Sequence, residues 1–306
     1  MTGLLDVGRG SEPIDSIDAY WTRLRALPQD TTTDRAILGG CVADRVGYAF
    51  AGGYDSALRA LVPAGVLPAN RVAALCATET GGGRPRNIAT RLEGGRVSGD
   101  KSFVTLGTSA DLFFVVASIA TEEQRATGRS ALKLVRVARG SDGVTIEPLP
   151  PTPFAPEIAH ARVTLRGVEV DDEDMLPGDG YDAYLKPFRT IEDIHVLGAM
   201  VGYLVGVARR YEWPRAFVAR LLAVASALRA LGAASPSSLE THVGLAGAFE
   251  LVRALLRESD ESDAHWATAH ADERARWERD RAILTVADTA RTLRLEAAWR
   301  RIDGMR

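Results

Sequence analysis

Short segments that alternate apolar and polar residues fill the middle of this chain, between two regions of helical periodicity. Between residues 71 and 171, the segments 132–137, 144–148 and 160–165 alternate in this way between clusters of glycine and proline. Such runs are typical of half-buried strands. Because helical patterns lie on both sides, we expect an α+β fold with its strands gathered in one central domain.

Two N-terminal segments, residues 15–26 and 33–61, have helical spacing of apolar residues. Thr33 or Asp34 would cap the second helix. The pairs Gly39-Gly40 and Gly52-Gly53 interrupt it, which indicates either close helix packing or a break. Residues 1–14 are expected to form a flexible lead.

The chain is predicted to be helical from Gly180 to its end. The first of these helices is apolar nearly all round, which indicates a buried helix. Helices are expected at residues 191–210, 216–231, 238–257 and 272–300. The predicted domains are a shortened N-terminal helical domain (1–70), a central antiparallel β-barrel-like domain (71–178) and a C-terminal four-helix-type bundle (179–306).

Composition narrows the function classes. The chain has 306 residues, 46% of them hydrophobic, and a net charge of −3, which gives no argument for binding nucleic acid. Two separated cysteines, Cys41 and Cys76, favour a reducing compartment without disulfides. We expect no export signal, no membrane span and a cytoplasmic location. No metal site is expected, and His265 and His270 are interpreted as a solvated face.

Two glycine-bearing turns stand out within the strand region. Gly81-Gly82-Gly83 follows the β-prone run 72–78, and a second turn at Gly107 follows Phe103 and Thr105. Glycines in such turns leave backbone N–H groups free to face an anion or the edge of a flat ring. The plainer interpretation is a pair of surface turns.

The residues around these turns resemble a known family. The segment 78–83 (TETGGG) resembles the TEPGxGSD signature of acyl-CoA dehydrogenases. The segment 103–107 (FVTLG) resembles the family's W-I/S-T-N-G flavin loop, and 109–116 (SADLFFVV) resembles the "ADL.LVVA" strand that follows it. The order of helices, strands and helices also matches the family's three-part architecture.

The resemblance implies an FAD site. Thr78 would bond the pyrimidine edge of the flavin, Thr105 would lie near N5, and Phe103 would pack on the ring. Gly81 and Gly83 would supply the turn, and Arg84, which replaces the signature serine, would either contact phosphate or fill the site. The alternative is that Thr78 and Thr105 are ordinary strand residues.

The resemblance also implies a carboxylate base. The family's usual glutamate would lie beyond Arg306, but the position used by a minority of members falls on Glu192. Alternatively, Thr190 and Asp193 form a capping box and Glu192 is a first-turn acid. His195, three residues on, is expected to be a core histidine bonded to backbone.

A third family feature is altered. Pro214 stands where many members have an arginine that reaches the flavin pyrophosphate of a neighbouring subunit. Arg210 and Arg215 are substitutes by position, but solvated helix charges are the expected interpretation.

The resemblance therefore implies an FAD-dependent oxidoreductase that dehydrogenates an acyl-CoA or acyl-carrier thioester at α,β. It would pass electrons to an electron-transfer acceptor and form a homodimer or homotetramer. Two alternatives remain open at this point. One is a catalytically degenerate homologue that serves as a partner subunit, and the other is a flavoprotein with a different substrate.

Overall fold

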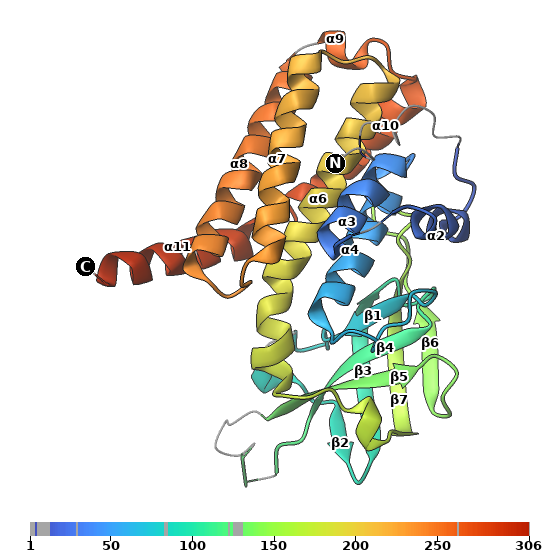
Figure 1. Cartoon of the computed structure of the whole chain (residues 1–306). Coiled ribbons are helices and arrows are strands. Elements are labelled where there is room, and N and C mark those ends of the chain that lie inside the picture. The colour runs from blue at the N-terminus through green and yellow to red at the C-terminus, as the bar shows by residue number, and fades with distance from the viewer. Residues whose placement is uncertain are drawn as a thin grey trace. The chain divides into compact units, whose positions relative to one another are not determined.

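The computed structural model describes residues 4, 13–28, 30–82, 85–121, 123–124, 131–261 and 263–305 (Figure 1). Two compact units make up the chain. The helical unit comprises Met1–Ala60, Pro153–Glu157 and Thr190–Arg306, and the β unit comprises Leu61–Thr152 and Ile158–Arg189. The predicted α+β class, with helices before and after a central run of strands, is confirmed. The three-domain division at residues 70 and 178 stays a prediction, and the expected lead at residues 1–14 falls mostly outside the described residues.

The N-terminal helices are α2 (Ile17–Arg25), α3 (Thr32–Val42) and α4 (Val46–Leu61). The predicted caps of the second segment were wrong. The hydroxyl of Thr31 accepts the backbone N–H of Asp34 at 3.0 Å, so the helix begins earlier than expected. The segment is broken after Val42, and both glycine pairs lie inside helices.

Close packing explains the glycines of α3 and α6 (Lys186–Arg210). A Cβ on Gly40 would lie 1.9 Å from the carbonyl oxygen of Ala199, and one on Gly202 would lie 1.9 Å from that of Ile37. Only glycine lets the two backbones approach this closely. The expectation that this helix is buried is confirmed.

Among the described residues, two helices are long and apolar enough, by length and composition alone, to cross a membrane. In the first, Gly180–Arg210, the apolar 18-residue window is 89% buried inside the protein, as in the core helix of a folded domain. The corresponding window of α7 (Arg215–Ala233) is 33% buried.

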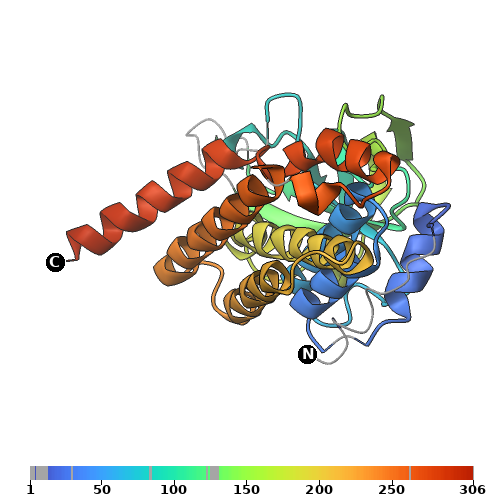
Figure 2. The same ribbon diagram turned by 90° about the horizontal axis from the view of Figure 1, so that it is seen from above.

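The C-terminal helices continue with α8 (Leu239–Glu261), α9 (Asp263–Trp266), α10 (Ala271–Asp280), the 3₁₀ turn η4 (Arg281–Leu284) and α11 (Asp288–Gly304). Figures 1 and 2 show α6, α7 and α8 side by side, with α11 ending at the C-terminus. The prediction of a single helix over 272–300 was wrong. The chain turns at Asp280, whose buried carboxylate accepts the N–H of Ala155 at 2.7 Å.

The β unit contains one seven-stranded sheet. Its strands are β1 (Ala73–Cys76), β2 (Arg91–Glu93), β3 (Arg96–Thr105), β4 (Leu112–Ser118), β5 (Leu132–Ala138), β6 (Val144–Pro148) and β7 (His160–Glu169). The order is β1-β4-β2-β3-β7-β6, with β5 paired to β4. Most pairs are antiparallel, as predicted, but β1 and β2 each pair with β4 in parallel.

Both cysteines are free and buried, as expected for a chain without disulfides. Burial raises the pKa of the Cys41 thiol to about 11 and that of Cys76 to about 12. Both side chains therefore act as core residues rather than as nucleophiles.

Candidate functional site

The first glycine turn lies against β3, the strand that carries Phe103 and Thr105. The N–H of Ser102 donates to the carbonyl oxygen of Thr78 at 2.9 Å, which fixes the chain after β1 beside β3. The N–H of Gly82 donates to the carbonyl of Glu79 at 2.7 Å, and Gly82 has a φ of 88°. The structure thus brings the first glycine turn to within three residues of Thr105 along the strand.

A buried ion pair holds this turn. Nζ of Lys101, on β3, lies 2.7 Å from a carboxylate oxygen of Glu79, and Lys101 is 0% exposed. Lys101 also donates to the carbonyl of Val116 at 2.7 Å, so it links the turn to β4. The carboxylate of Glu79 further accepts the Thr90 hydroxyl and the Ala89 N–H, each at 2.7 Å. Both of its carboxylate oxygens therefore accept hydrogen bonds, as a buried charge requires.

The protonation states follow from these contacts. Burial alone would raise the pKa of Glu79, but the charge of Lys101 and the hydrogen bonds outweigh burial and lower it. Burial lowers the pKa of Lys101, and Glu79 opposes that change. Sequence reasoning missed this pair. The sequence did contain one indication of it. Lys101 lies four positions after Val97 on β3, so the alternation of the strand places both side chains on its inward side.

A β-bulge turns Phe103 and Thr105 outward. Lys101 pairs with Val163 and Val104 pairs with Ala161, so β3 has one residue more than β7 between these pairs. The extra residue lets Lys101 and Val104 both point inward although they are three positions apart. Phe103 and Thr105 therefore face outward together.

Phe103 is 45% exposed, and its ring lies 4.2 Å from that of His160, centroid to centroid. His160 begins β7, directly opposite Thr105. Burial lowers the pKa of His160, which keeps its imidazole neutral near pH 7. Sequence reasoning did not select His160, because cross-strand register is not visible in a single sequence.

The second turn has a left-handed residue. Leu106 has a φ of 59° and is buried, although this conformation favours asparagine and glycine. A Cβ on Gly107 would lie 2.7 Å from that of Ala161, so glycine is required there. The guanidinium of Arg139 donates to the Thr108 carbonyl at 2.8 Å and holds the turn.

The groups at this surface suit a flat heteroaromatic ring with hydrogen-bonding edges. Thr78 is exposed and Thr105 is half-buried. Within the described residues, the N–H groups of Glu79, Thr80 and Gly81 donate no hydrogen bond. Together with the exposed Phe103 ring, they provide donors and an apolar face, as a flavin requires. Gly83 and Arg84 lie outside the described residues.

Glu192 lies in the helical unit, on α6, and is half-buried. The alternative of a capping box was wrong. α6 begins at Lys186, directly after a π-helical turn at Gly180–Leu185, so Glu192 is not in the first turn. Asp193 instead accepts Arg291 at 2.8 Å and Arg294 at 2.5 Å, both from α11.

His195 is a core histidine bonded to backbone, as predicted. Its Nδ1 lies 2.7 Å from the carbonyl oxygen of Ile191, and its Nε2 lies 2.9 Å from the hydroxyl of Thr32. Burial lowers its pKa to about 4. The imidazole is therefore neutral at pH 7 and bridges α6 to the start of α3.

This burial makes stability depend on pH. An unfolded histidine binds a proton near pH 6.5, whereas folded His195 binds one only near pH 4, so the unfolded state takes up more protons between these values. We expect the contribution of His195 to the free energy of unfolding to fall by about 2 kcal/mol from pH 7 to pH 5. Urea unfolding of the protein and of a His195→Asn variant at both pH values measures it. Equal pH dependence in the two proteins would contradict the assignment.

Arg210 and Arg215, the two residues that could replace the altered family arginine by position, differ in burial. Arg215 is exposed, as expected. Arg210 was expected to be solvated, which was wrong, because its guanidinium pairs with the buried carboxylate of Glu273. Tyr211 also donates to Glu273, at 2.6 Å. Pro214 precedes the first residue of α7.

The interpretation of His265 as part of a solvated face was also wrong. His265 is buried between Trp213 and Phe217, with ring centroids 5.0 Å and 4.9 Å away. His270 is exposed, as expected. The sequence places both histidines in a charged stretch, and only the tertiary packing reveals the aromatic neighbours of His265.

No protein-family model and no curated protein sequence matches the chain. Solved structures do match it. Butyryl-CoA dehydrogenase from Megasphaera elsdenii aligns with a TM-score of 0.65 and 13% identity, over 92% of this chain and 89% of that one. An acyl-CoA dehydrogenase from Geobacillus kaustophilus aligns at 0.62 and 16%, over 97% and 92%. PigA with FAD and proline aligns at 0.65 and 12%, over 99% and 92%.

Proposed function

Because the chain has the acyl-CoA dehydrogenase fold, we propose that it is an FAD-dependent oxidoreductase that dehydrogenates an acyl thioester at its α,β bond. The observation that carries the proposal is the outward surface formed by the turn at 78–82 and the end of β3. There an exposed aromatic ring, an exposed and a half-buried threonine, and backbone N–H groups that have no acceptor among the described residues occur together. A fold alone would not carry it, because folds outlast their chemistry.

The roles of this chain's residues follow from that surface. Thr78, Thr105 and the N–H groups of the turn at Gly81 would bond the polar edge of the flavin, and Phe103 would pack on its ring. Gly83 and Arg84 would extend the same turn toward the phosphates. When bound, FAD would supply the acceptor for the hydride that leaves Cβ.

Glu192 would act as the base. Its carboxylate would take the proton from Cα of the thioester. Glu192 is half-buried on α6, and the resemblance of this segment to the family assigns the base to its position.

The proposed context is cytoplasmic, with a homodimer or homotetramer and an electron-transfer acceptor for the reduced flavin. The substrate would be an acyl-CoA or an acyl group on a carrier protein. Neighbours described as butyryl-CoA dehydrogenase and as PigA with FAD and proline support a flavin and leave the acyl group open.

A degenerate partner subunit is the second candidate. It is favoured by the place of the altered family arginine, where Pro214 is the N-cap residue before α7 and Arg210 is paired with Glu273. The third candidate, a flavoprotein with another substrate, shares the cofactor surface with the first.

Anaerobic titration of the FAD-loaded protein with acyl-CoAs of increasing chain length tests the proposal. The first candidate predicts bleaching of the oxidised flavin by at least one thioester. Bound flavin that no acyl-CoA or acyl-carrier thioester bleaches would support the third candidate. Protein that binds no flavin would support the second.

A further inference from the structure

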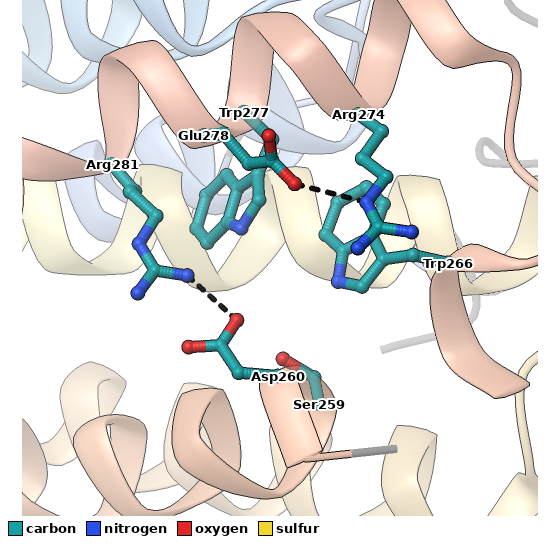
Figure 3. Close-up of a pocket in the computed structure, with 7 residues that line it drawn as sticks. All are labelled: Ser259, Asp260, Trp266, Arg274, Trp277, Glu278 and Arg281. Atoms are coloured by element: carbon teal, nitrogen blue, oxygen red, sulfur yellow. Dashed lines mark hydrogen bonds and ion pairs between the residues drawn. The ribbon is translucent and has the colours of Figure 1, made fainter. Parts of the chain in front are cut away.

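Aromatic rings of this chain lie in two different settings. A pocket of about 300 Å³ in the helical unit has Trp266 and Trp277 in its wall (Figure 3), but these side chains are only 5% and 1% exposed. Figure 3 also shows that the two arginines of its rim pair with acids of the same rim. These indoles are core residues. Phe103 differs from them, because its ring on β3 is 45% exposed and can meet a ligand.

The direction of the Phe103 ring is not set by the strand ladder. Phe103 lies in the bulge of β3, and none of the described ladder pairs between β3 and β7 includes it. A bulge leaves its extra residue unpaired and re-aims the side chains near it. An exposed phenyl ring in such a place would adopt several rotamers unless a neighbouring side chain held it.

His160 is the neighbour that holds it. The ring centroids of His160 and Phe103 are 4.2 Å apart with planes inclined by 30°, so the imidazole lies against a face of the phenyl ring rather than its edge. The backbone of His160 is itself fixed on two sides. It pairs with Thr105 of β3, and its carbonyl oxygen accepts the N–H of Leu149 at 2.9 Å.

We propose that His160 is a positioning residue of the flavin surface, which covers one face of the Phe103 ring and holds the opposite face outward for the flavin. This inference rests on the proposed function, because it takes Phe103 as the residue that packs on the flavin. Holding the ring before the cofactor arrives lowers the entropy that binding would otherwise lose in ordering it. His160 therefore raises the affinity for FAD through Phe103.

Titration of the protein and its variants with FAD, followed by flavin absorbance, tests the inference. His160→Ala should bind FAD about fivefold more weakly, because the aromatic pair that holds Phe103 is lost. His160→Phe retains an aromatic ring and should bind within about twofold of the unaltered protein. Thr164→Ala is the control, because Thr164 lies on the outward side of the same strand and bonds Asp100. It should bind FAD with unchanged affinity.

The Phe103→Ala background separates positioning from a general structural role. Since His160 acts through Phe103, adding His160→Ala to Phe103→Ala should weaken FAD binding by less than about twofold. A residue that only supports the fold would weaken binding equally in both backgrounds. If His160→Ala does not fold, His160→Leu replaces it in both comparisons, because leucine fills similar space without an aromatic ring.

The outcomes distinguish this inference from the proposed function. If the unaltered protein binds FAD, the inference alone is overturned by any of three results. These are unchanged affinity in His160→Ala, equal weakening with and without Phe103, or His160→Phe binding as weakly as His160→Ala. A protein that binds no FAD would overturn the proposed function and this inference together.

Discussion

Replacing Lys101 with methionine is expected to destabilise the protein by about 3–5 kcal/mol, because it leaves the Glu79 carboxylate buried without its counterion. The same change frees the turn at 78–82, which Lys101 holds against β3 and β4. Equilibrium unfolding in urea, followed by circular dichroism, measures the loss. A Glu79→Gln/Lys101→Met double variant should be less destabilised than the sum of its single changes, because it contains no buried unpaired charge.

A matched control lies on the outward side of the same strand. Arg166 pairs with Asp100 of β3 at 2.9 Å, but both side chains are more than half exposed. Arg166→Ala should therefore cost no more than about 1 kcal/mol. If Lys101→Met is no more destabilising than Arg166→Ala, the buried pair does not anchor the turn.

Replacing Glu192 with glutamine is expected to slow reduction of the flavin by acyl-CoA by about a thousandfold, because an amide cannot take the Cα proton. FAD binding should be unchanged, since Glu192 lies on α6 and none of the proposed flavin contacts does. Stopped-flow absorbance under anaerobic conditions measures the rate. Any loss should be in the rate of reduction rather than in the affinity for FAD.

Glu240→Gln is the control for this experiment, because Glu240 is an exposed acid in the first turn of α8. It should reduce flavin at the unaltered rate. A Glu192→Gln protein that reduces flavin as fast as the Glu240→Gln protein would exclude Glu192 as the base.

The fold was predictable because the spacing of apolar residues is regular within each strand and helix. Alternation in β5, β6 and β7 gave strands within a few residues of their observed bounds, and the all-apolar pattern of α6 gave its burial. Predictions failed where a tertiary contact decides the structure. The last predicted helix is interrupted after Asp280, whose buried carboxylate accepts the N–H of Ala155. The arginines of α11 bind Asp193, which sequence reasoning had placed in a cap.

The candidate site was predictable only in part, for the same reason. Thr78, Gly81, Phe103 and Thr105 were selected by their order along the chain. The pair of Glu79 with Lys101 depends on register across the sheet, and the contact of His160 with Phe103 depends on a bulge in β3. Neither register nor bulge leaves a clear trace in one sequence.

The central claim is that the surface formed by the turn at 78–82 and the end of β3 binds a flavin. The most direct test is the visible absorption spectrum of the purified protein, recorded with and without added FAD and after removal of unbound cofactor. We predict retained bands near ~450 nm that correspond to about one flavin per chain. A colourless protein that retains no added FAD would contradict the claim and leave the degenerate partner subunit as the account of this fold.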